Sequence, residues 1–232
     1  MTATELKDKF LLLYDKIAGN AAPPYLESEI ESFLNMAQLE YVKNHYNYKK
    51  NNTKEGIEET EKRRKDLSEL IKFNSPSVSQ DQTGIFPNGT FYDLPNDLMY
   101  TLTENATITS ENECINNNTI QIKPITHDEY NVSINNPFKK PNETIAWRMD
   151  FSKDSITQTK RHELITDGDY TISKYNLRYI KIPSDIDLTN NKTSELNEVV
   201  HDEIVNIAVR MATAVTEPSN YQIKAMEQQI SE

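Results

Sequence analysis

The sequence predicts an α+β fold in which N-terminal and C-terminal helices form one bundle and a small, mostly antiparallel β domain is inserted between them. Three observations lead to this prediction. Apolar residues recur at helical spacing near both ends, residues 170–183 are rich in β-branched and aromatic side chains, and turn signals separate short apolar segments over residues 84–183. Because strands joined by turns pair with their neighbours, the sheet is expected to be mostly antiparallel.

The most strand-like segment is residues 170–183, YTISKYNLRYIKIP, which we expect to form the central strand. The Asp-Gly pair at residues 167–168 favours a two-residue hairpin turn, with residues 161–166 as the preceding arm. Side-chain parity changes near residues 173–174, which predicts a bulge. The strand becomes apolar on both faces after residue 175, so we expect its end to be covered on both sides.

The N-terminal helical part is expected to span residues 1–75. Apolar residues recur at helical spacing over residues 6–17 and again over 27–46, where acidic residues in the first turn suit a helix N-terminus. A thinner apolar stripe over residues 57–71 predicts a third helix with a charged, solvated face.

Residues 73–83 are rich in Ser, Pro, Asn and Gln, which indicates a linker before a β domain at residues 84–183. Asn-Gly and Asn-rich pairs are typical of turns between strands. The expected features are, in order, a hairpin at 88–89, a strand at 98–108, a turn at 116–118, and strands at 119–125, 144–151 and 170–183.

A closing helix is expected over residues 194–216, with Ser194 as its N-cap. Its broad apolar face needs a partner layer, so we expect it to pack on the N-terminal helices. Residues 218–232 are expected to form a C-terminal tail, in which Ile223, Met226 and Ile230 make a short apolar stripe.

Composition excludes several classes of function. The chain has 232 residues with 25 Lys and Arg against 36 Asp and Glu, a formal net charge of −11, which disfavours binding to phosphate backbones and anionic membranes. No stretch approaches the ~20 apolar residues of a membrane span. With Cys114 as its one cysteine, the chain has no internal disulfide and no Cys-x-x-Cys zinc motif.

The search for catalytic chemistry yields no positive signal. The five glycines form no phosphate-binding loop, and no Gly-x-Ser-x-Gly elbow is present. The triplets at residues 127–129 and 201–203, both His-Asp-Glu, cannot converge on one ion because consecutive helical residues point about 100° apart. We therefore expect no catalytic residue, no metal and no cofactor. A hydrolase whose carboxylates are scattered in the sequence remains an alternative.

Several strings nevertheless resemble one family over nearly the whole chain. They are YDKIAGNAAPPYLESEIESFLNMAQLEYVKNHYN, GIEETEKRRKDLSELI, PITHDEYNVSINNPFKKP, ELITDGDYTISKYNLRYIKIP and HDEIVNIAVRMA. The chain resembles structural proteins of the head-to-tail connector of crAss-like bacteriophages of Bacteroides. The order of its elements is also similar to that of the adaptor ring proteins of short-tailed phages.

The resemblance implies a virion protein that acts by assembly. Its expected partners are copies of itself in a ring of about twelve, the portal protein and other neck or tail ring proteins, with phage DNA only as passing cargo. The expected location is the neck or tail region of the virion, and the host cytoplasm during assembly. A negatively charged ring would repel DNA from its wall.

Two segments are candidates for contact with neighbouring subunits. One lies between prolines and exposes apolar and basic groups, and the other is the apolar stripe of the tail. The candidate residues are Asn136, Pro137, Phe138, Lys139 and Lys140 in the first segment and Tyr221, Ile223, Met226 and Ile230 in the second. The alternative function is a tail-associated host-binding module, in which exposed aromatic residues such as Trp147 or Tyr92 would bind carbohydrate.

Overall fold

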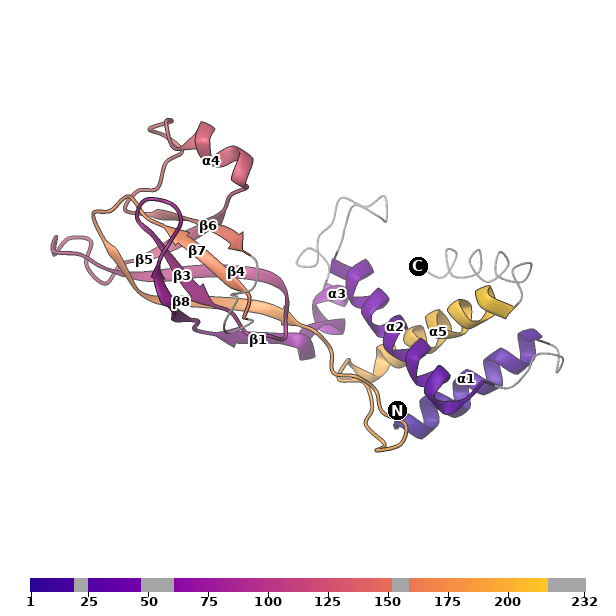
Figure 1. The fold of residues 1–232 in the computed structure, drawn as a ribbon. Coiled ribbons are helices and arrows are strands. Elements are labelled where there is room, and N and C mark those ends of the chain that lie inside the picture. Colours follow the sequence, from indigo (N-terminus) through magenta and orange to yellow (C-terminus); the bar gives the residue numbers. More distant parts are fainter. Residues whose placement is uncertain (19–24, 47–60, 152–158, 217–232) are drawn as a thin grey trace. The chain divides into compact units, whose positions relative to one another are not determined.

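The computed structural model divides the chain into two units (Figure 1). The first unit comprises Met1–Leu70 and Ile182–Glu232, and the second comprises Ile71–Lys181. The residues that the structure describes are 1–18, 25–46, 61–151 and 159–216. Among them, no helix is both long enough and apolar enough to cross a bilayer.

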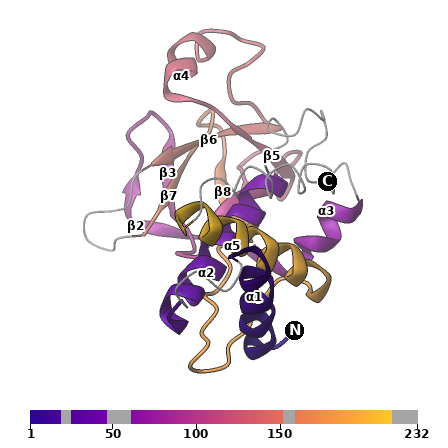
Figure 2. The ribbon, with the colours of Figure 1, turned by 90° about the vertical axis from the view of Figure 1, so that its right-hand side faces the viewer.

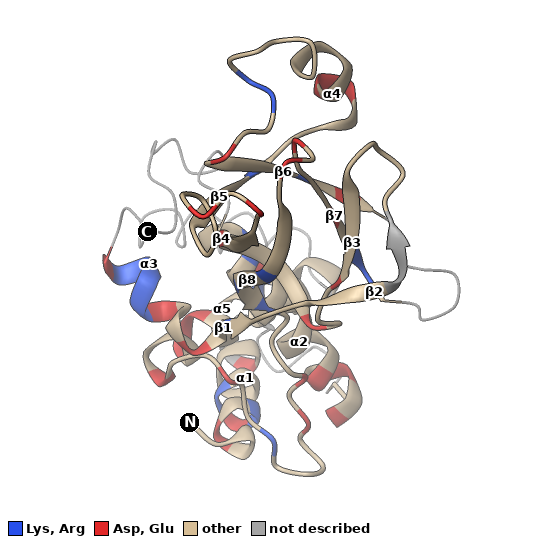
Figure 3. Cartoon of the chain, turned by 90° about the vertical axis from the view of Figure 1, so that its left-hand side faces the viewer, with Lys and Arg blue, Asp and Glu red and all other residues tan. Residues whose placement is uncertain are grey.

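The first unit is helical. Its α-helices are α1 (Ala3–Ala18), α2 (Glu27–Tyr46), α3 (Glu61–Asp66) and α5 (His201–Thr216). Helix α5 packs against both α1 and α2 (Figure 2), because its buried residues Ile204, Ala208 and Ala212 recur every four positions and form one apolar face. The Lys and Arg residues of α3 all follow one another in the sequence, and they form a basic group in Figure 3.

Two helix boundaries differ from the sequence prediction. Helix α5 begins at His201, after a 3₁₀ turn over Glu198–Val200 that is capped by the Asn197 side chain. Ser194, the predicted N-cap, instead donates to Gln38 Oε1 at 3.1 Å in the core of the unit. The third predicted helix was also too long, because α3 ends at Asp66 and residue 71 already belongs to a strand.

The second unit is one eight-stranded sheet with the order β1-β8-β4-β5-β6-β7-β3-β2. Its strands are β1 (Ile71–Asn74), β2 (Ser77–Thr83), β3 (Gly89–Asp93), β4 (Leu98–Thr109), β5 (Thr119–Pro124), β6 (Ile145–Phe151), β7 (Arg161–Ile165) and β8 (Thr171–Lys181). Strands β5 and β6 are parallel, and the other neighbouring strands in this order are antiparallel. A short helix, α4 (His127–Ser133), lies in the β5–β6 connection.

The sheet curls until its two edges come together at one corner. The edge strands β1 and β2 are consecutive in the sequence and are separated only by Ser75 and Pro76. Because a chain extends at most ~3.6 Å per residue, this link holds the two outermost strands within roughly 11 Å of each other at that point. The result is a half-barrel rather than a flat sheet.

The strand predicted over residues 170–183 is observed as β8, but it lies next to the edge strand β1 and is not the central strand of the sheet that the sequence predicted. It pairs with β1 on one side and with β4, the longest strand, on the other. The pairing changes from Thr107 opposite Lys174 to Ile108 opposite Ile172, which leaves Ser173 as the extra residue of a bulge. The predicted bulge at residues 173–174 is therefore confirmed.

The predicted hairpin at residues 167–168 is wrong. Strand β7 pairs with β3 and β6, whereas β8 pairs with β1 and β4, so the two strands joined by this turn are not neighbours. Gly168 has a φ of 98°, as an Asp-Gly turn requires, but the Asn88 side chain donates to the carbonyl of Asp167. The turn is thus hydrogen-bonded to the loop before β3. The strands β7 and β8 do not pair with each other, so a gap separates them at this turn.

Both faces of the sheet carry apolar clusters. Side chains alternate between the faces of a strand, and Leu164 accordingly belongs to the larger cluster on the concave face while Ile165 belongs to the smaller cluster on the other. The same alternation separates Ala146 from Trp147 on β6. The smaller cluster is covered by Tyr130 of α4.

The predicted fold class is therefore wrong. The chain is not a helical bundle with a small β insertion, because its main body is a curled, mixed eight-stranded sheet and its helices are few. The predicted linker at residues 73–83 includes most of the two edge strands. Polar residues suit an edge strand as well as a linker, and composition alone does not distinguish the two.

Candidate functional site

The concave face of the half-barrel contains a buried polar network. Arg148 on β6 pairs with Glu104 on β4, with 3.0 Å between Nη1 and Oε2, and the side chains are 11% and 5% exposed. His162 on β7 places Nδ1 at 2.9 Å from the hydroxyl of Tyr175 on β8, and that hydroxyl donates to Glu104. The other ring nitrogen of His162 lies 3.0 Å from the exposed carboxylate of Asp150.

This network joins strands that are not neighbours in the sheet. Strands β5 and β6 lie between β4 and β7 in the strand order, so the contacts of His162 with Tyr175 and Glu104 cross the concave side. Burial raises the pKa of Tyr175, with the Glu104 charge adding to the effect, so its hydroxyl stays protonated and donates. The hydrogen bond from His162 lowers the pKa of Asp150. The carboxylates of Glu104 and Asp150 are thus each paired with a basic side chain. This arrangement suits a network that supports the structure better than one that performs acid–base catalysis.

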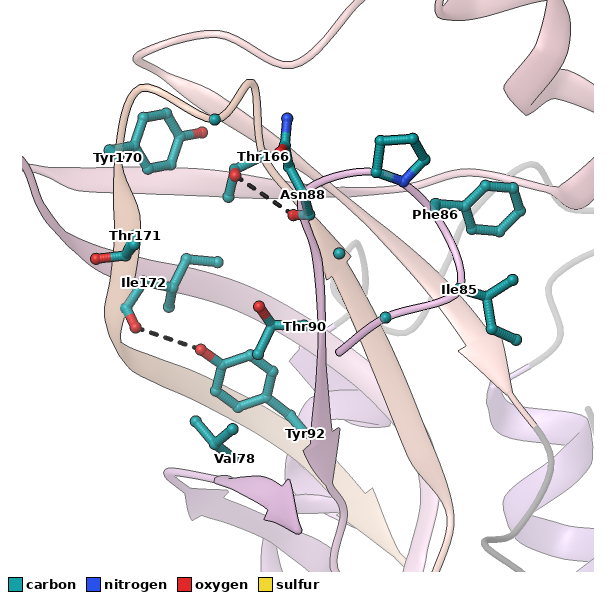
Figure 4. Close-up of a pocket in the computed structure, with 14 residues that line it drawn as sticks. Val78, Ile85, Phe86, Asn88, Thr90, Tyr92, Thr166, Tyr170, Thr171 and Ile172 are labelled. Atoms are coloured by element: carbon teal, nitrogen blue, oxygen red, sulfur yellow. Dashed lines mark hydrogen bonds between the residues drawn. The ribbon is translucent and has the colours of Figure 1, made fainter. Parts of the chain in front are cut away.

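A pocket of about 770 Å³ lies where β7 and β8 separate (Figure 4). Tyr92 on β3 crosses this gap and donates to the carbonyl of Ile172 on β8 at 3.3 Å. Thr166 donates to the carbonyl of Asn88 at 3.5 Å on the opposite side. The pocket is therefore an open recess bordered by the loop before β3, the turn between β7 and β8, and the start of β8.

Glu163 holds the loop that forms one wall of this pocket. Its carboxylate is fully buried, and Oε1 accepts a hydrogen bond from the Phe86 amide at 2.8 Å. A Cβ atom added to Gly84 or Gly89 would collide with this oxygen, so both positions require glycine. Burial raises the pKa of Glu163, while its backbone hydrogen bonds act in the opposite direction.

The first predicted contact segment lies in the connection between α4 and β6. Phe138 is 94% exposed, and Lys139 and Lys140 are also exposed. Asn136 and Pro137 form the preceding turn, in which Asn136 Oδ1 accepts from the Phe138 amide at 3.0 Å. The predicted exposure of the apolar and basic side chains in this segment is therefore observed. That the segment contacts a neighbouring subunit stays a prediction.

The structure gives no support to the other candidate residues, which are those of the C-terminal tail and of the host-binding alternative. Tyr221, Ile223, Met226 and Ile230 lie outside the described residues. The aromatic residues of the host-binding alternative, Trp147 and Tyr92, are 1% and 3% exposed, so neither offers a ring for sugar stacking.

The two His-Asp-Glu triplets do not form sites. His127 packs edge-on against Phe151, and His201 is buried with Nε2 at 3.0 Å from the Leu196 carbonyl. Burial lowers the pKa of His201, which favours the neutral ring. Within the described part of the chain, no group of His, Cys, Asp and Glu side chains could hold a metal ion. Cys114 is exposed.

Sequence reasoning missed the polar network and the pocket. A signal for the network was present, because Glu104 and Arg148 are charged residues inside the segments 98–108 and 144–151, which were expected to be strands. The pocket had no such signal, because its walls come from separate parts of the chain and an expected hairpin would have closed it.

We expect replacement of Arg148 by Met to lower the free energy of unfolding by about 3–5 kcal/mol, because Glu104 would stay buried without its cation. The double variant Arg148→Met/Glu104→Gln removes the buried charge and should recover much of this loss. Denaturant unfolding of the parent, single and double variants measures both effects. A double variant that is no more stable than the single variant would show that the unpaired charge of Glu104 is not what destabilises Arg148→Met.

Glu163→Gln should change how stability depends on pH. The pKa of Glu163 is raised in the folded state, so its contribution favours folding at low pH and is lost as pH rises from the unfolded pKa through the folded pKa. The Gln variant lacks this loss while its amide oxygen can still accept from Phe86. Its unfolding free energy relative to the parent should therefore rise as pH increases from the unfolded pKa of about 4.3 through the raised folded pKa, by up to ~1.4 kcal/mol per unit of pKa shift. The exposed Glu113→Gln variant is the control, and a relative stability that does not vary with pH would contradict the assignment.

Comparisons with known proteins identify the family. The family model described as phage tail ring protein 3/4 matches residues 1–222. The chain is 33% identical over 241 residues to Ring protein 4/5 of Bacteroides phage crAss001, an alignment that covers 92% of this chain and 93% of that protein. It is 26% identical over 226 residues to Ring protein 3 of the same phage, with coverage of 91% and 95%.

These matches confirm the resemblance found in the sequence, and they extend over both structural units. The relatives are named for rings, and they come from a crAss-like phage of Bacteroides. The chain therefore belongs to the phage tail ring protein 3/4 family.

Proposed function

We propose that this chain is the subunit of a closed ring, built from about twelve copies, in the head-to-tail connector of the virion. The observation that carries the proposal is the match to a tail ring family over residues 1–222, which leaves little of the chain for another function. Its neighbours would be the portal protein and other neck or tail rings. The chain would act by assembly, without catalysis and without a cofactor.

The charge of the chain supports a role as a conduit for DNA. A net charge of −11 per copy, repeated around a ring, gives a strongly negative assembly. DNA that passes through a negative channel is repelled by its wall and does not adhere to it. This supports passage of DNA as cargo and argues against stable binding of DNA.

The contacts that close the ring are proposed to include Asn136–Lys140 and the tail residues Tyr221, Ile223, Met226 and Ile230. Contacts between identical copies in a ring are heterologous, which means that one surface meets a different surface of the next copy. The cores of protein interfaces are enriched in aromatic residues, and Phe138 is exposed on the surface of the subunit.

Native mass spectrometry of the purified protein over a range of concentrations tests the proposal. We expect a single closed oligomer of about twelve copies that dissociates directly to monomers, without stable oligomers of smaller size. Negative-stain imaging of the same sample should show rings. A protein that stays monomeric at the highest concentration and is absent from purified particles would contradict the proposed function.

A further inference from the structure

The connection between β5 and β6 holds an exposed aromatic side chain in a defined position. Its inner side is anchored by Tyr130 of α4, whose ring centroid lies 4.1 Å from that of Phe86 and 5.9 Å from that of Trp147. Its outer side carries Phe138, which is 94% exposed. The connection extends from the sheet at α4 (Figure 1).

The turn that presents Phe138 is fixed by its own hydrogen bonds. The carbonyl of Asn136 accepts from the amides of Lys139 and Lys140, each at 3.0 Å, and the Asn136 side chain accepts from the amide of Phe138. A large aromatic group held in a preformed turn loses little conformational entropy when it binds. Aromatic residues, including phenylalanine, are enriched in the cores of protein interfaces.

The two lysines that follow Phe138 indicate which charge a partner surface should carry. Lys139 and Lys140 are exposed and have no carboxylate partner in the described part of the chain. They form the basic stretch between α4 and β6 in Figure 3. A surface that accepts this segment should therefore combine an apolar recess with acidic residues at its edge.

The pocket between β7 and β8 has both properties. Apolar side chains of Val78, Ile85, Tyr92 and Ile172 line it, and its volume of about 770 Å³ lies within the range of ~300–1,000 Å³ typical of binding pockets. The turn at its edge contains Asp167 and Asp169 on either side of Gly168, which itself lines the pocket. Asp169 is exposed, while Asp167 is half-buried and accepts from the Asp169 amide.

We propose that Phe138 of one copy inserts into this pocket of the next copy, with Lys139 and Lys140 facing Asp167 and Asp169 at its edge. Phe138 does not occupy the pocket of its own chain, because it is almost fully exposed. The inserted segment and the pocket are different surfaces, so the contact is heterologous and can repeat around a ring. The inference rests on the proposed function and names the surfaces through which the ring closes.

The first test is Phe138→Ala, with Phe73→Ala as a matched control. Phe73 is 64% exposed on β1 of the same unit, so both changes remove an exposed phenylalanine and leave the core intact. We expect Phe138→Ala to weaken ring assembly by about tenfold or more and Phe73→Ala to leave it close to that of the parent. Native mass spectrometry and sedimentation velocity measure the assembly midpoint.

The second test reverses the charges. Lys139→Glu/Lys140→Glu should weaken assembly because the new carboxylates would face Asp167 and Asp169. Adding Asp169→Lys to the same chain should restore assembly at least in part, and this rescue identifies a second copy as the partner. The single variant Asp169→Lys alone should also assemble more weakly than the parent.

The outcomes separate the two proposals. If the parent forms no ring in solution and is absent from purified particles, the proposed function fails and this inference fails with it. If the parent forms rings and Phe138→Ala forms them equally well, or if Asp169→Lys gives no rescue, this inference alone is overturned. An assembled Phe138→Ala ring that fails to bind another virion protein would likewise overturn it, because a different protein would then occupy the site of Phe138.

Discussion

Contacts across the concave face hold the half-barrel in its curled shape. Tyr175 on β8 donates to Glu104, contacts His162 and lies edge-on to Tyr92, with 5.4 Å between the ring centroids. These contacts connect strands from opposite parts of the sheet, and Arg148 compensates the buried charge of Glu104. A buried ion pair is costly unless its geometry is satisfied, but it specifies one arrangement among many, and here that arrangement is the curl.

The strand order of the curled sheet also produces the pocket and positions the exposed Phe138. Because β7 and β8 pair with different strands, the turn between them stays open and leaves a pocket instead of a closed hairpin. The parallel pairing of β5 and β6 requires a crossover, and that crossover carries α4 and Phe138. The pocket and the exposed aromatic residue are therefore both consequences of the strand order.

Local pattern predicted the elements better than their arrangement. The helix at residues 27–46, the strand at residues 170–183 and the bulge near Ser173 follow from side-chain periodicity, and they were predicted correctly, whereas the central place expected for that strand was not. Strand β2 could not be predicted because its polar sequence becomes a strand only by pairing with β3. The exposure of Phe138 was predicted from its flanking prolines and lysines. The pocket was not, because the segments that enclose it come together only through the strand order.

The central claim is that this chain forms a ring on the axis of the phage tail. Cryo-electron microscopy of intact particles tests it most directly, because the half-barrel and the packed helices α1, α2 and α5 can be fitted separately into the density. We expect one ring of about twelve copies between portal and tail, with each copy contacting the next through different surfaces. Density for the chain only at the tail tip, or its absence from the particle, would contradict the claim.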